Sequence, residues 1–135
     1  MTTLGPADED LIKVAALQRQ RAHAPYSKYK VGAAIRTKRN KTHAGANVEN
    51  ASYGLTVCAE RTAAFAAVNA GDKEFEAIAI VIDDERLPTP CGACRQVLAE
   101  FSPTMRVILA TTGGLRKATT LAELLPDPFL PESLT

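Results

Sequence analysis

The chain has 135 residues, of which 46% are hydrophobic and 23% charged, and its formal net charge is +1. This length suits one compact domain over residues 1–135, and the composition is typical of a globular protein. No apolar run approaches the ~20 residues of a membrane-spanning helix, which excludes membrane insertion, and the small net charge provides no general attraction to nucleic acid.

The N-terminal segment and the cysteine count bear on location. The segment is acidic and lacks the basic region and apolar core of a secretory signal, so we expect a cytoplasmic protein. The three cysteines, an odd number, argue against a structural disulfide framework. Metal binding, redox chemistry and burial remain as their possible roles.

The first half of the chain predicts a helix, a β-hairpin and a second helix. Residues 8–22 carry apolar residues at helical spacing, with acids at the start and arginines at the end, as the helix dipole favours. Residues 31–37 and 42–48 predict two strands joined by a basic turn, which we interpret as a solvated hairpin end. Alanine-rich residues 58–70 predict a largely buried helix.

The second half of the chain alternates strands and helices. The apolar run 76–82 predicts a central strand covered on both faces, and residues 105–110 predict another strand. Residues 92–101 between them have apolar side chains at helical spacing. With a last strand at 117–119 and a short helix at 120–125, this order predicts an α/β domain with helices packed on a mixed sheet.

The cysteines lie at the expected starts of two helices. Cys58 begins the alanine-rich helix, while Cys91 and Cys94 stand three residues apart at the start of the helix over 92–101. If the two helix N-termini converge, three thiolates can fill three corners of a zinc tetrahedron and leave the fourth for water or substrate. The helix dipoles favour thiolate over thiol. This pattern indicates a catalytic metal site.

Polar residues around the cysteines add to this interpretation. Arg61 and Arg95 each lie near a possible ligand and can donate hydrogen bonds to thiolate sulfur. Glu60 follows Cys58 by two residues on an otherwise apolar helix, where a buried carboxyl requires a polar task, such as carrying a proton. Residues 47–54 form a polar stretch that either borders the site or is a turn bonding its own backbone.

Other uses of the thiols stay open at this point. Cys91 and Cys94 can form a redox pair, although that role leaves the third cysteine without a purpose. A structural zinc would need a fourth ligand, and the histidines are His23 and His43. We expect His23 near the end of the first helix and His43 exposed in the hairpin, so neither is favoured as a ligand.

Several motifs together resemble the small homotetrameric zinc-dependent cytidine deaminases. Cys58-Ala59-Glu60 with Pro90-Cys91-x-x-Cys94 is similar to the zinc signature, in the form with cysteine where relatives have histidine. The resemblance covers nearly the whole chain and includes Ala24-Pro25-Tyr26-Ser27, Val31-Gly32-Ala33-Ala34, Asn47-Val48-Glu49-Asn50-Ala51, Cys58-Ala59-Glu60-Arg61-Thr62-Ala63, Pro90-Cys91-Gly92-Ala93-Cys94-Arg95-Gln96 and Leu124-Leu125-Pro126-x-x-Phe129. It implies a three-layer α/β/α fold with a mixed sheet of about five strands.

The resemblance implies a reaction: hydrolysis of cytidine and 2'-deoxycytidine to uridine and 2'-deoxyuridine with release of ammonia, in pyrimidine salvage. Cys58, Cys91 and Cys94 would hold one Zn2+ per chain. Glu60 would be the proton shuttle that activates water and then protonates the base and the leaving amine. The partners implied are a small nucleoside and further copies of the chain, with no nucleic acid and no membrane.

The resemblance also implies substrate contacts, at Tyr29, Asn47, Val48, Glu49, Tyr53, Ala59 and Phe129. Asn47 and Glu49 match positions that hold the ribose hydroxyls, and the backbone of Ala59 matches one that binds the base. The aromatic side chains at 29 and 129 flank the base. Phe129 and Tyr53 are expected to act across subunit boundaries, so that neighbouring subunits complete each site.

Two positions depart from the family pattern, and two alternatives remain. Tyr29 stands where phenylalanine is more common, which adds a hydroxyl, and Ala46 replaces a common cysteine. One alternative is a deaminase of another aminopyrimidine nucleoside, such as blasticidin S, although the Asn47/Glu49 pair and Phe129 favour cytidine. The other is a non-catalytic, zinc-stabilised nucleic-acid-binding module, which the small charge and low aromatic content disfavour.

Overall fold

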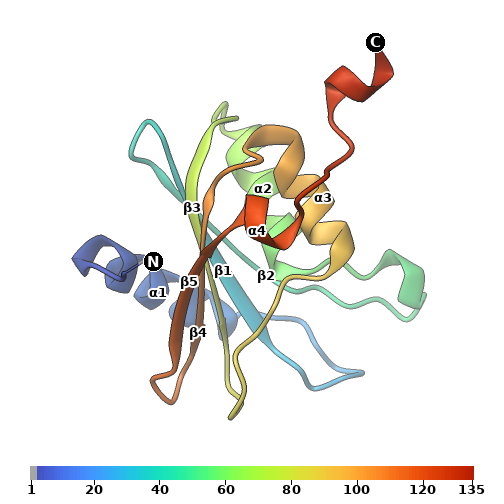
Figure 1. The fold of residues 1–135 in the computed structure, drawn as a ribbon. Coiled ribbons are helices and arrows are strands. Elements are labelled where there is room, and N and C mark those ends of the chain that lie inside the picture. Colours follow the sequence, from blue (N-terminus) through green and yellow to red (C-terminus); the bar gives the residue numbers. More distant parts are fainter. Residues whose placement is uncertain (1–2) are drawn as a thin grey trace.

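A mixed sheet of five strands forms the centre of the fold, in the order β2-β1-β3-β4-β5 (Figure 1). The structure is a computed structural model that describes residues 3–135. The strands are β1 (Val31–Thr37), β2 (Thr42–Ala46), β3 (Phe75–Ile82), β4 (Arg106–Thr111) and β5 (Arg116–Thr120). β3 and β4 run parallel, whereas the other neighbours run antiparallel. The expected mixed sheet is confirmed.

Helices cover both faces of this sheet (Figure 1). α1 (Pro6–Arg19) packs on one face, and α2 (Ala59–Asn69) and α3 (Gly92–Phe101) pack on the other. The short α4 (Leu121–Leu124) lies on the same side as α3, and 3-10 turns occupy Tyr53–Leu55 and Pro131–Leu134. Three layers in an α/β fold are therefore confirmed. Within the described residues, no helix is long and apolar enough to cross a membrane.

β3 is the central strand, and its apolar run follows from burial on both faces. Its larger side chains, such as Ile78 and Ile80, join the core beneath α2 and α3. Its smaller side chains, such as Ala77 and Ala79, lie beneath α1. The prediction of a strand covered on both sides is confirmed, with the start one residue earlier than the sequence indicates.

Long-range contacts move some element boundaries away from their predicted positions. α1 begins at Pro6, where a missing backbone donor is tolerated, and ends at Arg19 rather than at residue 22. The chain leaves the helix because His23 N donates to Asn47 O at 2.9 Å and its backbone pairs with Val48. α2 also differs from its prediction, since one of its faces is exposed, including Phe65.

The prediction that His43 is exposed is wrong. Its Nε2 lies 2.8 Å from Asp72 Oδ2, and the Asp72 side chain is 4% exposed. Arg39 Nη1 reaches the other carboxylate oxygen at 3.3 Å. The buried acid that follows α2 thus draws the histidine of the β1–β2 hairpin inward, whereas the Arg39 side chain stays exposed while it contacts Asp72. Neither His43 nor His23 joins the cysteines in a metal-binding group among the described residues.

Gly32 allows α1 to lie directly on β1. A Cβ at this position would fall 2.7 Å from Arg19 N and still closer to Ala15 O. Gly32→Ala is therefore expected to lower the free energy of unfolding by about 1–3 kcal/mol, as overpacking does. Thermal unfolding measures this against Gly54→Ala, where an added Cβ meets nothing within 4 Å. Equal Tm values for the two variants would contradict this close approach.

Arg106 at the start of β4 anchors the first turn of α1 through Asp8. Arg106 Nε and Nη2 donate to the two carboxylate oxygens of Asp8 at 3.2 and 2.7 Å, and Gly5 N donates at 2.9 Å. Burial alone would raise the pKa of Asp8. The hydrogen bonds from Arg106 and Gly5 and the positive charges of Arg106 and Arg36 outweigh it, so the pKa lies below its ordinary value.

The depressed pKa of Asp8 predicts a pH-dependent contribution to stability. Asp8→Asn is expected to cost about 1–3 kcal/mol at neutral pH, since the hydrogen bonds lose their charge. A lowered pKa in the folded state means that this contribution is complete above the ordinary aspartate pKa. It is lost as the pH falls through the folded-state value. Urea unfolding of both proteins from neutral to acid pH measures it, and a pH-independent difference would contradict the assignment.

Candidate active site

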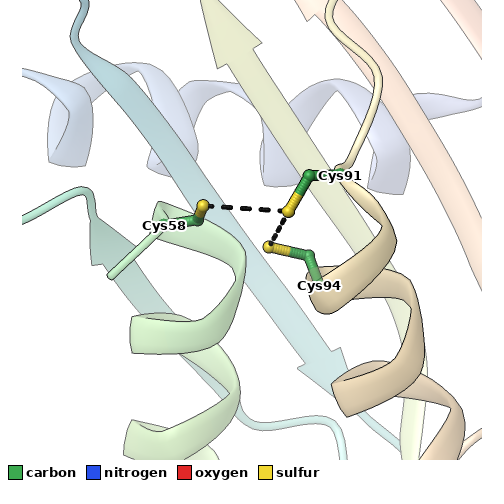
Figure 2. A group of neighbouring side chains, drawn as sticks. All are labelled: Cys58, Cys91 and Cys94. Atoms are coloured by element: carbon green, nitrogen blue, oxygen red, sulfur yellow. Dashed lines mark hydrogen bonds between the residues drawn. The ribbon is translucent and has the colours of Figure 1, made fainter. Parts of the chain in front are cut away.

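Topology brings the three cysteines to one end of the sheet. α2 leads into β3 and α3 leads into β4, and because these two strands are parallel, the two helices start at the same edge. Cys58 and Cys91 are the N-cap residues of α2 and α3, and Cys94 lies in the first turn of α3. Figure 2 shows the three thiols turned toward one another between these helix starts. The expected convergence is confirmed.

The sulfur geometry fits an open three-thiolate zinc site. Sγ of Cys58 lies 4.0 Å from Sγ of Cys91, which lies 3.4 Å from Sγ of Cys94. A zinc–sulfur bond of ~2.3 Å in a tetrahedron places sulfurs about 3.8 Å apart, between these two values. All three sulfurs lie within 4.8 Å of one another, and no fourth ligand joins the group among the described residues. A structural four-ligand zinc does not fit.

The thiols influence one another's ionisation. Hydrogen bonding from Cys94 lowers the pKa of Cys58 to about 5, against the effect of burial, and Arg61 adds a hydrogen bond and its charge. The same proximity to Cys58, together with burial, raises the pKa of Cys94 above its ordinary value. Neighbouring thiolates repel, so all three sulfurs ionise together only when a cation lies between them. The donor set thus calls for a metal.

Arg61 contacts the cluster, whereas Arg95 does not. Arg61 Nη2 donates to Cys58 Sγ at 3.5 Å, and its buried Nε has no hydrogen-bond partner in the described structure. The prediction that Arg95 donates to a thiolate is wrong. Its guanidinium donates to Pro90 O at 2.8 Å, to Leu124 O at 2.8 Å and to Thr89 Oγ1 at 2.9 Å. Arg95 therefore ties α3 to the turn before Cys91 and to α4.

Glu60 is buried beside the thiols. It lies in the first turn of α2 and is 5% exposed. Burial, together with the negative charge of Cys58, raises the pKa of Glu60 to about 7. A carboxyl with this pKa can both accept and release a proton near neutral pH. Its position and its ionisation both suit a proton carrier.

A pocket of about 270 Å³ opens over the thiols and Glu60. Cys58 and Cys91 lie in its wall with Glu60. Of the predicted substrate contacts, four line the same pocket: Tyr29, Asn47, Glu49 and Ala59. The volume is slightly below the roughly 300–1,000 Å³ typical of ligand-binding pockets. The structure therefore brings a metal-binding group, a buried acid and several polar side chains together at one mostly apolar cavity.

A second hollow of about 390 Å³ adjoins this pocket and is lined by Tyr53 and Tyr26, whose rings meet edge to face at 5.9 Å. Tyr53 thus lies beside the pocket rather than in it, and it is 75% exposed. Val48 pairs through its backbone with His23 and Val57, and it lines neither cavity.

Phe129 is also absent from both pocket walls. Its ring is 58% exposed, and its carbonyl oxygen accepts a 2.6 Å hydrogen bond from Gln96 Nε2. This single chain does not bring Phe129 to the thiols. The expectation that it acts across a subunit boundary stays a prediction.

Sequence reasoning missed several functions of the pocket wall. The Asn47 amide accepts from Val31 N and donates to Tyr29 O, both at 2.8 Å, and so fixes the start of β1. Ser27 and Thr56 also line the pocket. Ser27 stands in one of the motifs that carry the resemblance, which is the signal that could have directed attention to it.

Comparison with known proteins agrees with this geometry. Residues 6–111 match the family described as the cytidine and deoxycytidylate deaminase zinc-binding region. The chain is 49% identical to the cytidine deaminase of Halalkalibacterium halodurans, over 92% of this chain and 95% of that protein. It is 38% identical to the blasticidin-S deaminase of Bacillus cereus, over 74% and 76% of the two chains.

The same likeness appears among solved structures. The crystal structure of cytidine deaminase from Burkholderia pseudomallei matches with a TM-score of 0.87 and 48% sequence identity, covering 96% of this chain and 100% of that one. The family match spans α1 to β4 and includes all three cysteines and Glu60. The chain belongs to the cytidine and deoxycytidylate deaminase zinc-binding family.

Proposed function

We propose that this chain deaminates cytidine and 2'-deoxycytidine hydrolytically, yielding uridine and 2'-deoxyuridine plus ammonia in pyrimidine salvage. The observation that carries the proposal is the meeting of three thiols beside the buried Glu60, with Cys58, Cys91 and Glu60 in the wall of one small pocket. Membership of the deaminase family and the names of the relatives support it. A binding module would not require a buried acid beside an open metal site.

In this proposal Cys58, Cys91 and Cys94 hold one zinc ion per chain. Zinc in such a site lowers the pKa of water and supplies a nucleophile at neutral pH. Arg61 offsets part of the negative charge of the sulfurs through its contact with Cys58. Glu60 follows the ligand Cys58 by two residues at the start of α2, so its carboxyl lies beside the reacting centre.

Glu60 moves the protons of the reaction. It takes one from the water that adds to C4 of the cytosine ring and gives it to N3 of the base. It then takes the second proton from the new C4 hydroxyl and delivers it to the amino group, which leaves as ammonia while C4 becomes a carbonyl. Burial raises the pKa of Glu60 above its ordinary value, which suits a group that both takes up and releases a proton.

The pocket wall orients the nucleoside. Tyr29 flanks the base, and the backbone of Ala59 binds its edge. Asn47 and Glu49 bind the ribose hydroxyls. The side-chain amide of Asn47 has two N–H groups, so a second one can donate to the ribose while the first bonds Tyr29 O. The position of these groups along the wall of one cavity supports these roles.

A homotetramer of single-domain chains is part of the proposal. One sheet runs through the described residues, which supports one catalytic domain over residues 1–135. Tyr53 and Phe129 are large, exposed and outside the pocket over the thiols, as expected of groups that complete a neighbour's site. Light scattering after gel filtration measures the assembly. A cytoplasmic location fits three cysteines that form no disulfide.

Blasticidin-S deaminase activity is the second candidate, because one relative with that name is 38% identical. Turnover of cytidine, 2'-deoxycytidine and blasticidin S by the zinc-loaded protein separates the two. We expect the highest kcat/KM with the two simple nucleosides, for which Glu49 and Asn47 provide ribose contacts. A kcat/KM for blasticidin S above that for both nucleosides would contradict the proposal.

A further inference from the structure

The hydroxyl of Ser27 connects two residues of the pocket wall. Ser27 Oγ donates to Glu49 Oε2, and it accepts a hydrogen bond from Tyr29 N at 3.0 Å. Glu49 and Tyr29 lie 20 residues apart in sequence and on separate segments. Ser27 itself lines both the pocket over the thiols and the adjoining hollow. One hydroxyl therefore links the groups proposed to meet the ribose and the base.

The backbone beside Ser27 completes the contacts of the Glu49 carboxylate. The N–H groups of Tyr26 and Ser27 donate to Oε1 at 3.0 and 3.1 Å. Each carboxylate oxygen can accept two hydrogen bonds. The two backbone donors therefore use both acceptor positions of Oε1. Oε2 uses one position for the Ser27 hydroxyl and keeps its second position for another donor.

The turn over residues 26–29 has an uncommon backbone conformation. Lys28 has a φ of 62°, in the left-handed region that non-glycine residues rarely adopt. Lys28 N donates to Ala24 O at 3.0 Å and closes the turn. Because the chain reverses here, the backbone N–H groups of residues 26 and 27 point at the Glu49 carboxylate. The N–H of Tyr29 points back at the Ser27 hydroxyl.

The same contacts favour an ionised Glu49. The hydrogen bond from Ser27 is the largest cause that lowers the pKa of Glu49 below its ordinary value. Desolvation opposes it, and the backbone donors of Ser27 and Tyr26 and the charge of His23 reinforce it. An ionised, anchored carboxylate is a strong acceptor for a sugar hydroxyl, because charge-assisted hydrogen bonds exceed neutral ones.

We propose that Ser27 is a positioning residue for substrate: its hydroxyl fixes the Glu49 carboxylate as the acceptor for a ribose hydroxyl and couples it to Tyr29. The inference rests on the proposed deaminase function. Ser27 acts before the chemical step, so it affects binding of the nucleoside rather than proton transfer. Its removal should therefore appear in KM and leave kcat almost unchanged.

Steady-state kinetics with cytidine test whether the effect of Ser27 falls on KM and not on kcat. Ser27→Ala is expected to raise KM about tenfold, the effect of one charge-assisted hydrogen bond, and to change kcat by no more than about twofold. Ser27→Thr retains the hydroxyl and should keep KM near that of the wild type. Ser52→Ala is the matched control, because Ser52 is exposed and its side chain makes no capping hydrogen bond.

A double-mutant cycle shows whether Ser27 acts through Glu49. In a Glu49→Gln background, the further change Ser27→Ala should alter KM by less than about twofold, because the charged partner is gone. An equal rise in KM in both backgrounds would overturn the proposal. So would a wild-type KM in Ser27→Ala, or a rise in Ser27→Thr as large as that in Ser27→Ala.

A second measurement needs no substrate. Carboxyl titration by NMR should give Glu49 a higher pKa in Ser27→Ala than in the wild type and in Ser52→Ala. An unchanged Glu49 pKa would contradict the hydrogen bond itself. A wild-type protein without activity on cytidine would instead contradict the proposed function, while the titration still decides whether Ser27 holds the carboxylate.

Discussion

Glu60→Gln is expected to abolish cytidine turnover while leaving the zinc content at one ion per chain. Glutamine has nearly the same shape, but it can neither accept nor release a proton at neutral pH. Glu60 is buried beside the thiols and is proposed to act on the water, the base and the leaving amine. General acid–base catalysis contributes roughly 10²–10⁴-fold, and we expect a loss in kcat of at least this size.

Kinetic assays and metal analysis of the same samples check this prediction. Glu100→Gln provides the matched control, because it replaces the same residue type in the same way at an exposed position of α3. Its kcat should stay within about twofold of the wild-type value, as expected of surface substitutions. A Glu60→Gln protein that binds zinc and turns over cytidine at the wild-type rate would contradict the role of Glu60.

Cys94→Ala is expected to remove both zinc and activity. Cys94 is fully buried, and its Sγ lies 3.4 Å from that of Cys91. Without it two thiols remain, and an open zinc site normally has three protein ligands. Because metal binding contributes to folding free energy, the purified variant should also unfold at a lower temperature than the zinc-loaded wild type.

Zinc per chain, measured after gel filtration, is the deciding quantity for Cys94→Ala. Ala93→Ser is the control, because it changes an exposed neighbour in the same helical turn without removing a ligand. Retention of one zinc by Cys94→Ala would show that the cluster is not the metal site. A wild-type protein that lacks zinc but cycles a disulfide between Cys91 and Cys94 would favour redox chemistry instead.

The sequence predicts those parts of the fold that depend on local pattern. The apolar run of β3 and the helical spacing of α3 are confirmed, because burial leaves a direct periodic signal. Boundaries set by distant partners are not predictable in this way. α1 ends early because His23 pairs with the chain near Val48, and His43 is drawn inward by Asp72, which lies 29 residues away.

The same distinction applies to the candidate site. Thiol chemistry and spacing identify the three cysteines, and the parallel pair β3 and β4 explains why they meet. The hydrogen-bond partners of the two arginines could not be predicted. Arg95 directly follows Cys94 and yet bonds elsewhere, whereas Arg61, three residues after Cys58, donates to its sulfur. The contact of Ser27 with Glu49 spans 22 residues and carries no periodic signal.

An ultraviolet assay of cytidine conversion, run on protein of known zinc content, tests the central claim most directly. The zinc-loaded protein should convert cytidine to uridine with release of ammonia. Removal of zinc by a chelator should abolish this activity, and re-addition of zinc should restore it. Undiminished conversion by zinc-free protein, or no conversion by protein that holds one zinc per chain, would contradict the account.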